Sequence, residues 1–374
     1  MTIQPAVWRV SFQQRVEYEI VKCAHLLDAR NEALLSRGKR DGARRFVVVD
    51  QAIERLHGED LRGYFDWHHV KARIVALPGG EANKSVENYR RIVDELDAFP
   101  IDRRDEPILA IGGGVLTDLV GFAAGTYRRG VPHIRVPTTL MGYVDAAIGV
   151  KTGINFNAHK NRLGAFEPPL MVLLDKAFLQ TLPARHIRNG VCEMIKLAMI
   201  ADLRLFELLE RDGRRCIETW FQDERGTQVL DRAVQGMVNE LQPNLLEGDL
   251  SRRMDFGHTF SYGIETAADS PWLHGEAVLM DVMLSSVLAS DRKLLPAADL
   301  QRLFGLIARL GIEVSLDALE PDILWQSLQE RTLHRNGWQR TPLPHGIGEC
   351  TFVNDVSLDE VRAAFAGMPA LHGG

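Results

Sequence analysis

The chain has 374 residues, which is enough for one large domain or two ordinary domains with a sizeable core. Hydrophobic residues make up 45% of the chain and charged residues 25%, a composition that excludes disordered and collagen-like proteins. The 44 basic and 50 acidic residues give a net charge of −6, so the chain as a whole shows no preference for a polyanion such as nucleic acid.

The cysteines and the N-terminus indicate the compartment. Cys23, Cys192, Cys216 and Cys350 are far apart and form no CxxC pair, which argues against a disulfide scaffold and against a thiolate zinc cluster. The N-terminal segment has no basic patch followed by an apolar core, and no later run approaches the roughly 20 apolar residues that span a bilayer. We therefore expect a cytoplasmic protein that does not enter a membrane.

The elements expected in chain order fall into two groups. Short β-branched runs at 46–49 and 108–111 alternate with an amphipathic stretch at 85–96, which predicts βα units of a mostly parallel sheet. From Pro183 onward the pattern is helical, with long runs at 191–209 and 275–295. This predicts an α/β domain over 1–182 followed by a mostly α-helical domain over 183–374.

A glycine run follows the second predicted strand. Gly112, Gly113 and Gly114 lie between an apolar strand and a helical pattern, where backbone N–H groups and a helix N-terminus can receive a phosphate. The spacing is not GxGxxG, because Thr117 stands where the third glycine would be. A tight turn without a ligand is the alternative. Asp50, at the end of the first predicted strand, either accepts ribose hydroxyls or caps a helix.

Basic residues are concentrated between Leu119 and Phe166. This stretch holds a single acid, Asp145, against the six basic residues Arg128, Arg129, Arg135, Lys151, Lys160 and Arg162. A solvated surface normally mixes both signs of charge, so the stretch predicts an anion-binding site. Few aromatic residues accompany it, which argues against stacking on nucleic acid bases.

Glu193, His258 and His274 form a candidate metal set. Glu193 and Lys196 share one face of an otherwise apolar helix, where they act in a site or form a plain ion pair. Two histidines and a carboxylate leave one coordination position open, as catalytic zinc requires. Structural histidines are the alternative, since no HExxH motif is present.

Several segments in order resemble the sugar phosphate cyclases, whose founding member is 3-dehydroquinate synthase. They are GGGVLTDLVGFAAGTYRRG, RVPTTLMGYVDAAIGVKTGIN, HKNRLGAF, FLQTLPARHIRNGVCEMIK, DFGHTF and LHGEAV, and the match runs from about Phe46 to Asp355. The resemblance implies a Rossmann-like NAD domain followed by a helical metal domain, a homodimer, and an enzyme that removes phosphate from a seven-carbon sugar phosphate with NAD and Zn²⁺ or Co²⁺.

The resemblance also implies roles for particular residues. The metal ligands would be Glu193, His258 and His274. The NAD site would hold Asp50, Glu81, Lys84, Gly113, Gly114, Val115, Asp118, Thr138, Thr139, Lys151, Lys160, Phe178 and Thr181. The substrate and its chemistry would depend on Arg129, Asp145, Lys151, Asn161, Lys196, Asp255 and His334.

Departures from the dehydroquinate synthase pattern concern the substrate. Met237 replaces a lysine and Asp255 replaces an asparagine, so a substrate carboxylate would lose a cation and face an anion. Together with VEYEIV and His334, these changes resemble the cyclases of sedoheptulose 7-phosphate, above all the 2-epi-5-epi-valiolone synthases. Tyr262 departs from that pattern and keeps the 2-epi-valiolone and desmethyl-4-deoxygadusol synthases open as alternatives. Dehydroquinate synthase follows, and then an NAD- and metal-dependent polyol dehydrogenase, whose pattern lacks KTGIN and HKNRLGAF.

Overall fold

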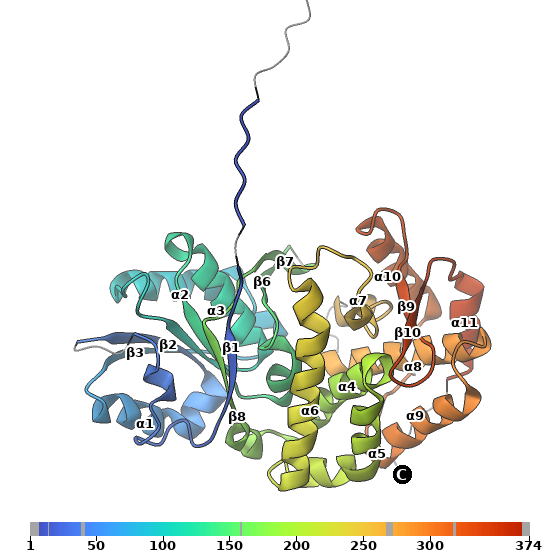
Figure 1. Ribbon diagram of the computed structural model, residues 1–374, viewed down its shortest axis with the longest axis horizontal. Helices are drawn as coiled ribbons and strands as arrows, with labels where there is room; N and C mark the ends of the chain where they lie inside the picture. The colour runs from blue at the N-terminus through green and yellow to red at the C-terminus, as the bar shows by residue number, and fades with distance from the viewer. Residues whose placement is uncertain are drawn as a thin grey trace, which may run out of the picture.

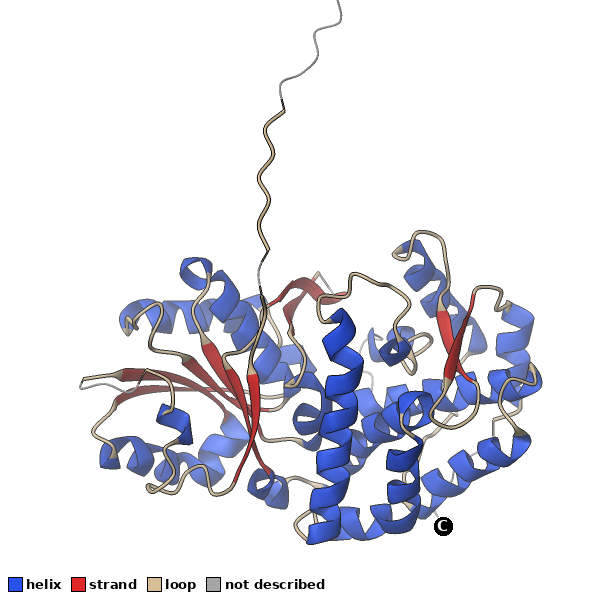
Figure 2. Ribbon diagram, in the orientation of Figure 1, coloured by secondary structure: helices blue, strands red, loops and turns tan. Residues whose placement is uncertain are grey.

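The computed structural model describes residues 7–13, 15–38, 42–157, 159–266, 272–316 and 319–368. A sheet-containing half and a helical half lie side by side (Figures 1 and 2). The expected α/β domain followed by a helical domain is confirmed as a fold class. The strands of the large sheet end by Asp175 and the long helices of the second half begin at Ala184, but the division between 182 and 183 stays a prediction.

The sheet of the first half has six parallel strands. In sheet order they are β1 (Glu19–Cys23), β8 (Met171–Asp175), β5 (His133–Pro137), β4 (Ile108–Gly112), β2 (Arg44–Asp50) and β3 (Lys71–Leu77). Val47 of β2 stands opposite Ile74 on one side and Leu109 on the other. Both faces of β2 are buried, which explains its nearly continuous apolar run.

Alternate residues of the strands supply two separate cores. Val47 and Val49 face the core that contains helix α1 (Gln51–Trp67). Phe46 and Val48 face the core formed with α2 (Val86–Ala98) and α3 (Gly114–Thr126). The sheet is therefore covered on both sides, and its carboxyl edge is left for the glycine turn.

The basic stretch folds into a π-helical turn and a hairpin beside α3. The turn is η4 (Gly142–Ala146), and the hairpin consists of β6 (Lys151–Phe156) and β7 (His159–Phe166). Thr152 of β6 packs against α3 at Gly121, where an added Cβ would lie 2.4 Å from the Thr152 Cγ2 atom. This contact joins the hairpin to the sheet domain.

Helices dominate the second half of the chain. They are α4 (Ala184–Ala201), α5 (Leu203–Glu218), α6 (Glu224–Leu241), α7 (Tyr262–Thr266), α8 (His274–Asp291), α9 (Ala297–Arg309), α10 (Pro321–Leu333) and α11 (Leu358–Ala366), with a hairpin of β9 (Thr341–Pro344) and β10 (Cys350–Val353). Helices α4 and α8 pack together and are almost fully buried. The run expected at 191–209 is not one helix, because Asp202 ends α4 and caps α5 by accepting a hydrogen bond from Leu205 N at 3.0 Å.

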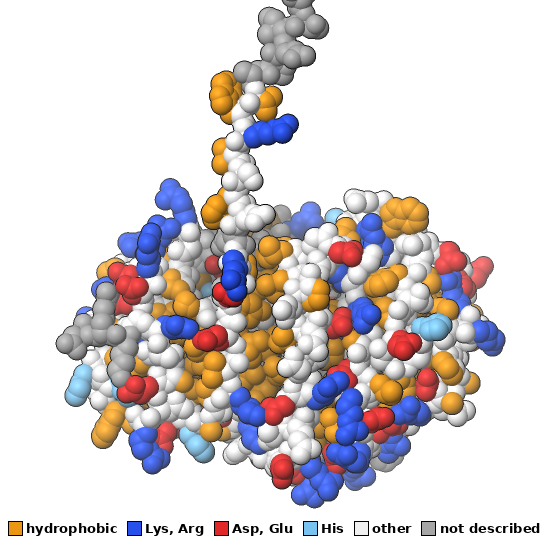
Figure 3. All heavy atoms as spheres, in the orientation of Figure 1, with side chains coloured by type: hydrophobic (Ala, Val, Ile, Leu, Met, Phe, Trp, Pro, Cys, Tyr) orange, Lys and Arg blue, Asp and Glu red, His pale blue; other side chains and the backbone are white. Residues whose placement is uncertain are grey.

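The described N-terminal residues 7–13 extend away from the body (Figure 1). Their apolar side chains are exposed, with Trp8 at 86% and Phe12 at 85% (Figure 3). All four cysteines are free thiols. Within the described residues, no helix combines the length and apolar character needed to cross a membrane.

Candidate active site

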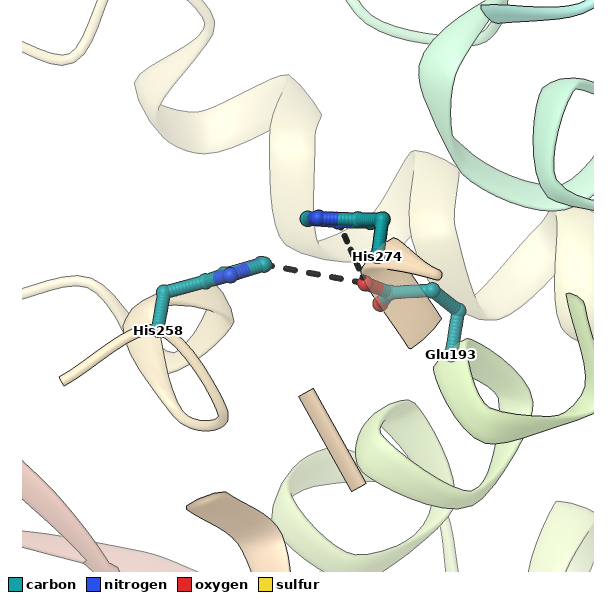
Figure 4. Close-up of side chains that lie close together, drawn as sticks. All are labelled: Glu193, His258 and His274. Carbon is teal, nitrogen blue, oxygen red and sulfur yellow. Dashed lines mark ion pairs between the residues drawn. The ribbon is translucent and has the colours of Figure 1, made fainter. Parts of the chain in front are cut away.

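Three potential metal ligands meet in the helical half. Glu193 lies on α4 and is 1% exposed, His258 lies in the loop before α7, and His274 begins α8. Glu193 Oε1 lies 3.3 Å from His274 Nε2 and 3.8 Å from His258 Nε2 (Figure 4). The two imidazole rings stack with their centroids 5.3 Å apart. One ligand atom from each residue falls within 4.8 Å of the others, so the structure brings the predicted set together.

The chemistry of this donor set suits a divalent cation. Both carboxylate oxygens of Glu193 are buried, with the Lys196 ammonium against Oε2 and the two imidazole rings on the side of Oε1. Burial alone would raise the pKa of Glu193, but Lys196 and His274 hold it well below its ordinary value. Burial and the nearby Lys196 keep the pKa of His258 well below its ordinary value, so that ring is neutral. A carboxylate and two imidazoles that leave one position open fit Zn²⁺ or Co²⁺.

Glu265 on α7 orients one of these histidines. Its Oε2 atom lies 2.8 Å from His274 Nδ1, which leaves Nε2 of the same ring directed at Glu193. Burial would raise the pKa of Glu265, but His274 lowers it to about 2, so it is a carboxylate. Carboxylates behind metal-binding histidines fix the tautomer and the ring position. Sequence reasoning missed Glu265, although it follows the end of the DFGHTF motif by only five residues.

The loop that carries His258 is held from two helices. Asp281 of α8 is 0% exposed and accepts hydrogen bonds from the backbone N–H groups of Phe260 and, at 3.1 Å, Ser261. Burial raises the pKa of Asp281 to about 6, against the effect of these donors. Arg331 of α10 donates to the carbonyl of His258. The loop therefore has a fixed position without regular secondary structure.

Two further predicted residues lie against the metal set. Lys196 follows Glu193 by one helical turn, is 1% exposed and forms an ion pair with that carboxylate. Its Nζ atom lies 3.1 Å from His258 Nε2. Asp145 of η4 is close enough to this cluster to feel its charges, and burial followed by the charge of Glu193 raises the pKa of Asp145. A buried ammonium and a second carboxyl group thus accompany the ligands.

Lys151, at the start of β6, is the accessible cation of this region. Its side chain is 63% exposed and its ammonium forms an ion pair with Glu247, which sequence reasoning missed. Desolvation by the surrounding protein, followed by repulsion from Arg252, lowers the pKa of Lys151 to about 8. The nearby Asp255 and Asp145 act in the opposite direction. An ammonium that reaches solvent can receive an incoming phosphate.

The glycine turn lies where β4 meets α3. A Cβ atom added at Gly113 would lie 2.9 Å from the Thr139 Cγ2 atom, and one added at Gly114 would lie 2.9 Å from the Ala146 Cβ atom. Packing against these neighbours therefore requires glycine at both positions. The same turn exposes the N-terminus of a 13-residue helix to a phosphate group.

Asp50 performs the capping role and also adjoins the glycine turn. Its Oδ1 atom accepts a hydrogen bond from Ala52 N at 2.7 Å at the start of α1. A Cβ atom added at Gly112 would lie 3.3 Å from the Asp50 Cβ atom, and one at Gly79 would lie 2.4 Å from Oδ2. Asp50 can therefore cap α1 and still face the carboxyl edge of the sheet.

A hydrogen-bonded network connects predicted cofactor and substrate residues. Lys84 is 3% exposed and donates to Asp118 at 2.6 Å and to the side-chain oxygen of Asn161. Asn155 accepts from Asn161 N at 2.9 Å and donates to Glu81 Oε1 at 2.9 Å. The other predicted cofactor residues are Val115 on α3, Thr138 after β5, Thr139 before η4, Lys160 on β7, and Phe178 and Thr181 on η5 (Lys176–Thr181).

Asp255 is not the free anion that the sequence suggested. Its carboxylate is 2.9 Å from Arg252, 3.1 Å from Arg331 and also paired with Arg335. Burial would raise the pKa of Asp255, but these guanidinium groups lower it to about 2. The three arginines carry more positive charge than Asp255 carries negative charge. The expectation that Asp255 presents a free negative charge to a substrate carboxylate is therefore wrong. Arg252 precedes Asp255 by three residues and could have been found from the sequence, whereas Arg331 and Arg335 come from a distant segment.

Other predicted residues lie outside this cluster. Met237 is 1% exposed and belongs to the core of the helical half, so it faces no described cavity. His334 is exposed at the end of α10. Arg129 is exposed beyond the C-terminal end of α3, about 20 Å along a 13-residue helix from the glycine turn. Tyr262 begins α7, three residues before Glu265.

The basic stretch contributes fewer anion-binding groups than its composition suggested. Arg135 is fully buried and donates to backbone carbonyls, so it is not available to a ligand. Lys160 forms an ion pair with Glu265 at 3.3 Å. Lys151 remains the exposed cation nearest the metal set, and it carries the anion-binding prediction.

This combination of a two-sided parallel sheet, a glycine turn and a buried Glu/His/His set defines a two-domain, metal-binding α/β protein. Family models for the 3-dehydroquinate synthase N-terminal and C-terminal regions match residues 74–189 and 190–332. The chain belongs to the 3-dehydroquinate synthase family, and the resemblance drawn from its motifs is confirmed.

The relatives within this family are close. The chain is 48% identical to a 2-epi-5-epi-valiolone synthase of Streptomyces hygroscopicus subsp. jinggangensis, over 96% of this chain and 89% of the relative. A demethyl-4-deoxygadusol synthase of Trichormus variabilis is 36% identical, over 96% and 89%. The solved structure of ValA, the 2-epi-5-epi-valiolone synthase of the same Streptomyces strain with NAD⁺ and Zn²⁺ bound, matches with a TM-score of 0.92 and 46% identity, over 96% and 98%.

Proposed function

We propose that this chain is a sedoheptulose 7-phosphate cyclase that forms 2-epi-5-epi-valiolone with NAD and Zn²⁺ or Co²⁺. The observation that carries the proposal is the cluster of Glu193, His258 and His274, with the Lys196 ammonium against it. The identity of 48% to a 2-epi-5-epi-valiolone synthase, against 36% to a demethyl-4-deoxygadusol synthase, favours this product.

The cofactors supply chemistry that no side chain can supply. NAD, when bound, would supply reversible hydride transfer, which would acidify a C–H bond next to the oxidised carbon and so allow phosphate to leave. Glu193, His258 and His274 would hold a divalent metal, which would supply polarisation of a substrate oxygen. The Asp50, Glu81, Lys84 and Asp118 side chains and the glycine turn are proposed to hold NAD.

The protein side chains bind, orient and neutralise. Lys151 and Asn161 are proposed to hold the leaving phosphate, whereas Arg129, exposed outside the cluster, keeps only the role that the family resemblance implies. The buried Lys196 ammonium lies 3.1 Å from His258 and would offset negative charge that develops on a substrate beside it. Asp145, whose pKa burial raises, can exchange a proton beside this ammonium. Elimination makes the enzyme a phosphorus–oxygen lyase, and ring closure then follows by an intramolecular aldol addition.

A homodimer and a cytoplasmic location form part of the proposal. Four exposed apolar side chains on residues 7–13, Val7, Trp8, Val10 and Phe12, and an apolar area beside β1 and α6 offer surface to a second copy (Figure 3). Four free thiols are in keeping with a reducing compartment.

The test supplies the purified protein, NAD and Zn²⁺ or Co²⁺ with sedoheptulose 7-phosphate or with 3-deoxy-D-arabino-heptulosonate 7-phosphate in separate reactions. We expect phosphate release from the first sugar without net NADH, and the ring-proton couplings of the product distinguish 2-epi-5-epi-valiolone from 2-epi-valiolone and demethyl-4-deoxygadusol. Phosphate release from the carboxylated sugar alone would assign the chain to dehydroquinate synthesis. Net NADH from a polyol would instead indicate a dehydrogenase.

A further inference from the structure

A three-residue link joins the two catalytic candidates of the sheet half. Residues 147–149 follow η4, which contains Asp145. Val150 comes next, and Lys151 is the first residue of β6. All three carbonyls of the link accept hydrogen bonds from side chains far away in the sequence. Arg135 donates to the first carbonyl at 3.4 Å and to the third at 2.6 Å, and the Tyr18 hydroxyl donates to the second at 2.6 Å.

The bonds come from two different parts of the sheet. Arg135 lies on β5, in the middle of the sheet, whereas Tyr18 precedes the edge strand β1. The carbonyl of Val150, which follows the link, accepts from Glu167 N at 2.7 Å. Four consecutive carbonyls before Lys151 are therefore held by partners from three separate segments.

Arg135 directs its hydrogen bonds to backbone carbonyls and to one imidazole rather than to a carboxylate. The residue is 0% exposed, and among the described residues Asp118 and Glu167 act on its charge without forming an ion pair with it. Its remaining contacts are His133 Nε2 at 3.2 Å and the Glu167 carbonyl at 3.3 Å. A buried guanidinium is costly, and an apolar side chain of similar volume often fills such a space at no loss of stability. What an apolar side chain cannot do is hold carbonyls.

We propose that Arg135 and Tyr18 are positioning residues, which fix the 147–149 link and so set where Lys151 and Asp145 stand relative to the metal set. This inference rests on the proposed function, because it assigns a purpose to residues placed in that reaction. A reacting group displaced by about 1 Å can lose roughly 100-fold in rate. If the carbonyls of the link were not held, Lys151 and Asp145 could shift by such a distance and the reaction would slow.

The test compares Tyr18→Phe with Tyr64→Phe in the full-length, metal- and NAD-loaded protein. Tyr64 is a matched control, since its buried hydroxyl also donates to a backbone carbonyl, that of Asn31, at 2.7 Å, and it lies in the α1 core away from the link. We expect Tyr18→Phe to speed amide exchange in a peptide covering 146–152 by about 2- to 10-fold, the equivalent of one net hydrogen bond. We expect kcat for phosphate release to fall by about 5- to 100-fold.

Arg135 gives a second, independent comparison. Arg135→Met should speed the same exchange and lower kcat further, while Arg135→Lys, which keeps one donor group, should recover part of kcat. Equal exchange and equal kcat in Tyr18→Phe and Tyr64→Phe would overturn the inference, as would faster exchange with unchanged kcat. A wild-type protein that releases no phosphate would overturn the proposed function instead, whereas exchange is measured without substrate and still tests the link.

Discussion

The two halves of the molecule hold their chemical groups in different ways. In the helical half, Glu193 and Lys196 are each 1% exposed, sit on one helix and contact the histidines directly. In the sheet half, Lys151 lies on a hairpin with 63% of its side chain exposed. Asn161, on the second strand of the same hairpin, has a left-handed backbone, with φ of 53°, and accepts a hydrogen bond from Lys84.

The difference in exposure between the two halves suits two tasks, metal binding in the helical half and phosphate binding in the sheet half. A metal site gains from rigid, dry surroundings, because fixed dipoles and charges act strongly there. A site that takes in and releases phosphate needs solvent access and a cation that is not permanently paired in the interior. The structure therefore concentrates electrostatic stabilisation in the helices and exchange with solvent in the hairpin.

The largest effect is expected from removal of a metal ligand. His258→Ala should lose bound Zn²⁺ and lower phosphate release by about 1,000-fold or more, since the remaining ligands no longer enclose the ion. Metal content by elemental analysis and phosphate release provide the measurements. His69→Ala, at an exposed histidine after α1, is the control. Full zinc content with near-normal turnover in His258→Ala would break the assignment of the helical half.

The cation of the sheet half should show itself in the pH dependence. The pKa of Lys151 is lowered to about 8, so its ammonium is present below pH 8 and is lost as the pH rises through that value. Arg252, Lys196, Asp255, Asp145 and Glu247 are the charges that face it. We expect kcat/KM to fall above pH 8, and Lys151→Gln to lose roughly 100-fold below it. An unchanged alkaline limb in Lys151→Arg would remove Lys151 from the phosphate site.

Glu265→Gln tests whether the Glu265 carboxylate holds the His274 ring in place for metal binding. The amide keeps the shape but removes the charge that faces His274 Nδ1 at 2.8 Å. Metal affinity should fall by roughly tenfold or more. A titration with a competing chelator measures it, and Glu87→Gln, at an exposed position on α2, is the control. Equal affinities in the two variants would show that Glu265 does not support the site.

Asp255→Asn tests whether the charges around Asp255 decide between the sugar phosphate that carries a carboxylate and the one that does not. Without this carboxylate, Arg252, Arg331 and Arg335 lose their shared counterion. We expect affinity for the carboxylated heptulosonate phosphate to increase by about tenfold relative to sedoheptulose 7-phosphate, measured as competitive inhibition constants. No relative gain would mean that the arginines do not reach the substrate.

The smallest effect concerns the contact between α3 and the hairpin. Gly121→Ala would place a Cβ atom 2.4 Å from the Thr152 Cγ2 atom, so we expect a loss of about 1–3 kcal/mol in the free energy of unfolding. Gly63→Ala, in α1 with nothing within 4 Å, should instead stabilise by up to about 1 kcal/mol. Denaturant unfolding of both variants measures the difference. Equal stabilities would show that Thr152 can move aside from residue 121 without loss of stability.

Local patterns predicted the fold well but not the partners of charged residues. Alternating βα units and the helical second half followed from periodicity, and the Glu/His/His set followed from residue types and motif order. The pairs of Glu247 with Lys151 and of Arg331 and Arg335 with Asp255 could not be predicted, because they join segments that meet only in three dimensions. The break at Asp202 was hidden since the apolar pattern continues on both sides. Arg135 was misjudged because composition does not distinguish a buried guanidinium from an exposed one.

The position of Glu193 along α4 makes the metal site sensitive to small rotations at the junction of the halves. Pro183 caps the helix, and Glu193 follows ten residues later, about 15 Å along the axis. With this lever arm, a rotation of about 5° at the cap moves the carboxylate by about 1.3 Å, which is more than a reacting geometry tolerates. The orientation of α4 relative to the sheet half can therefore vary by only a few degrees before Glu193 leaves its working position.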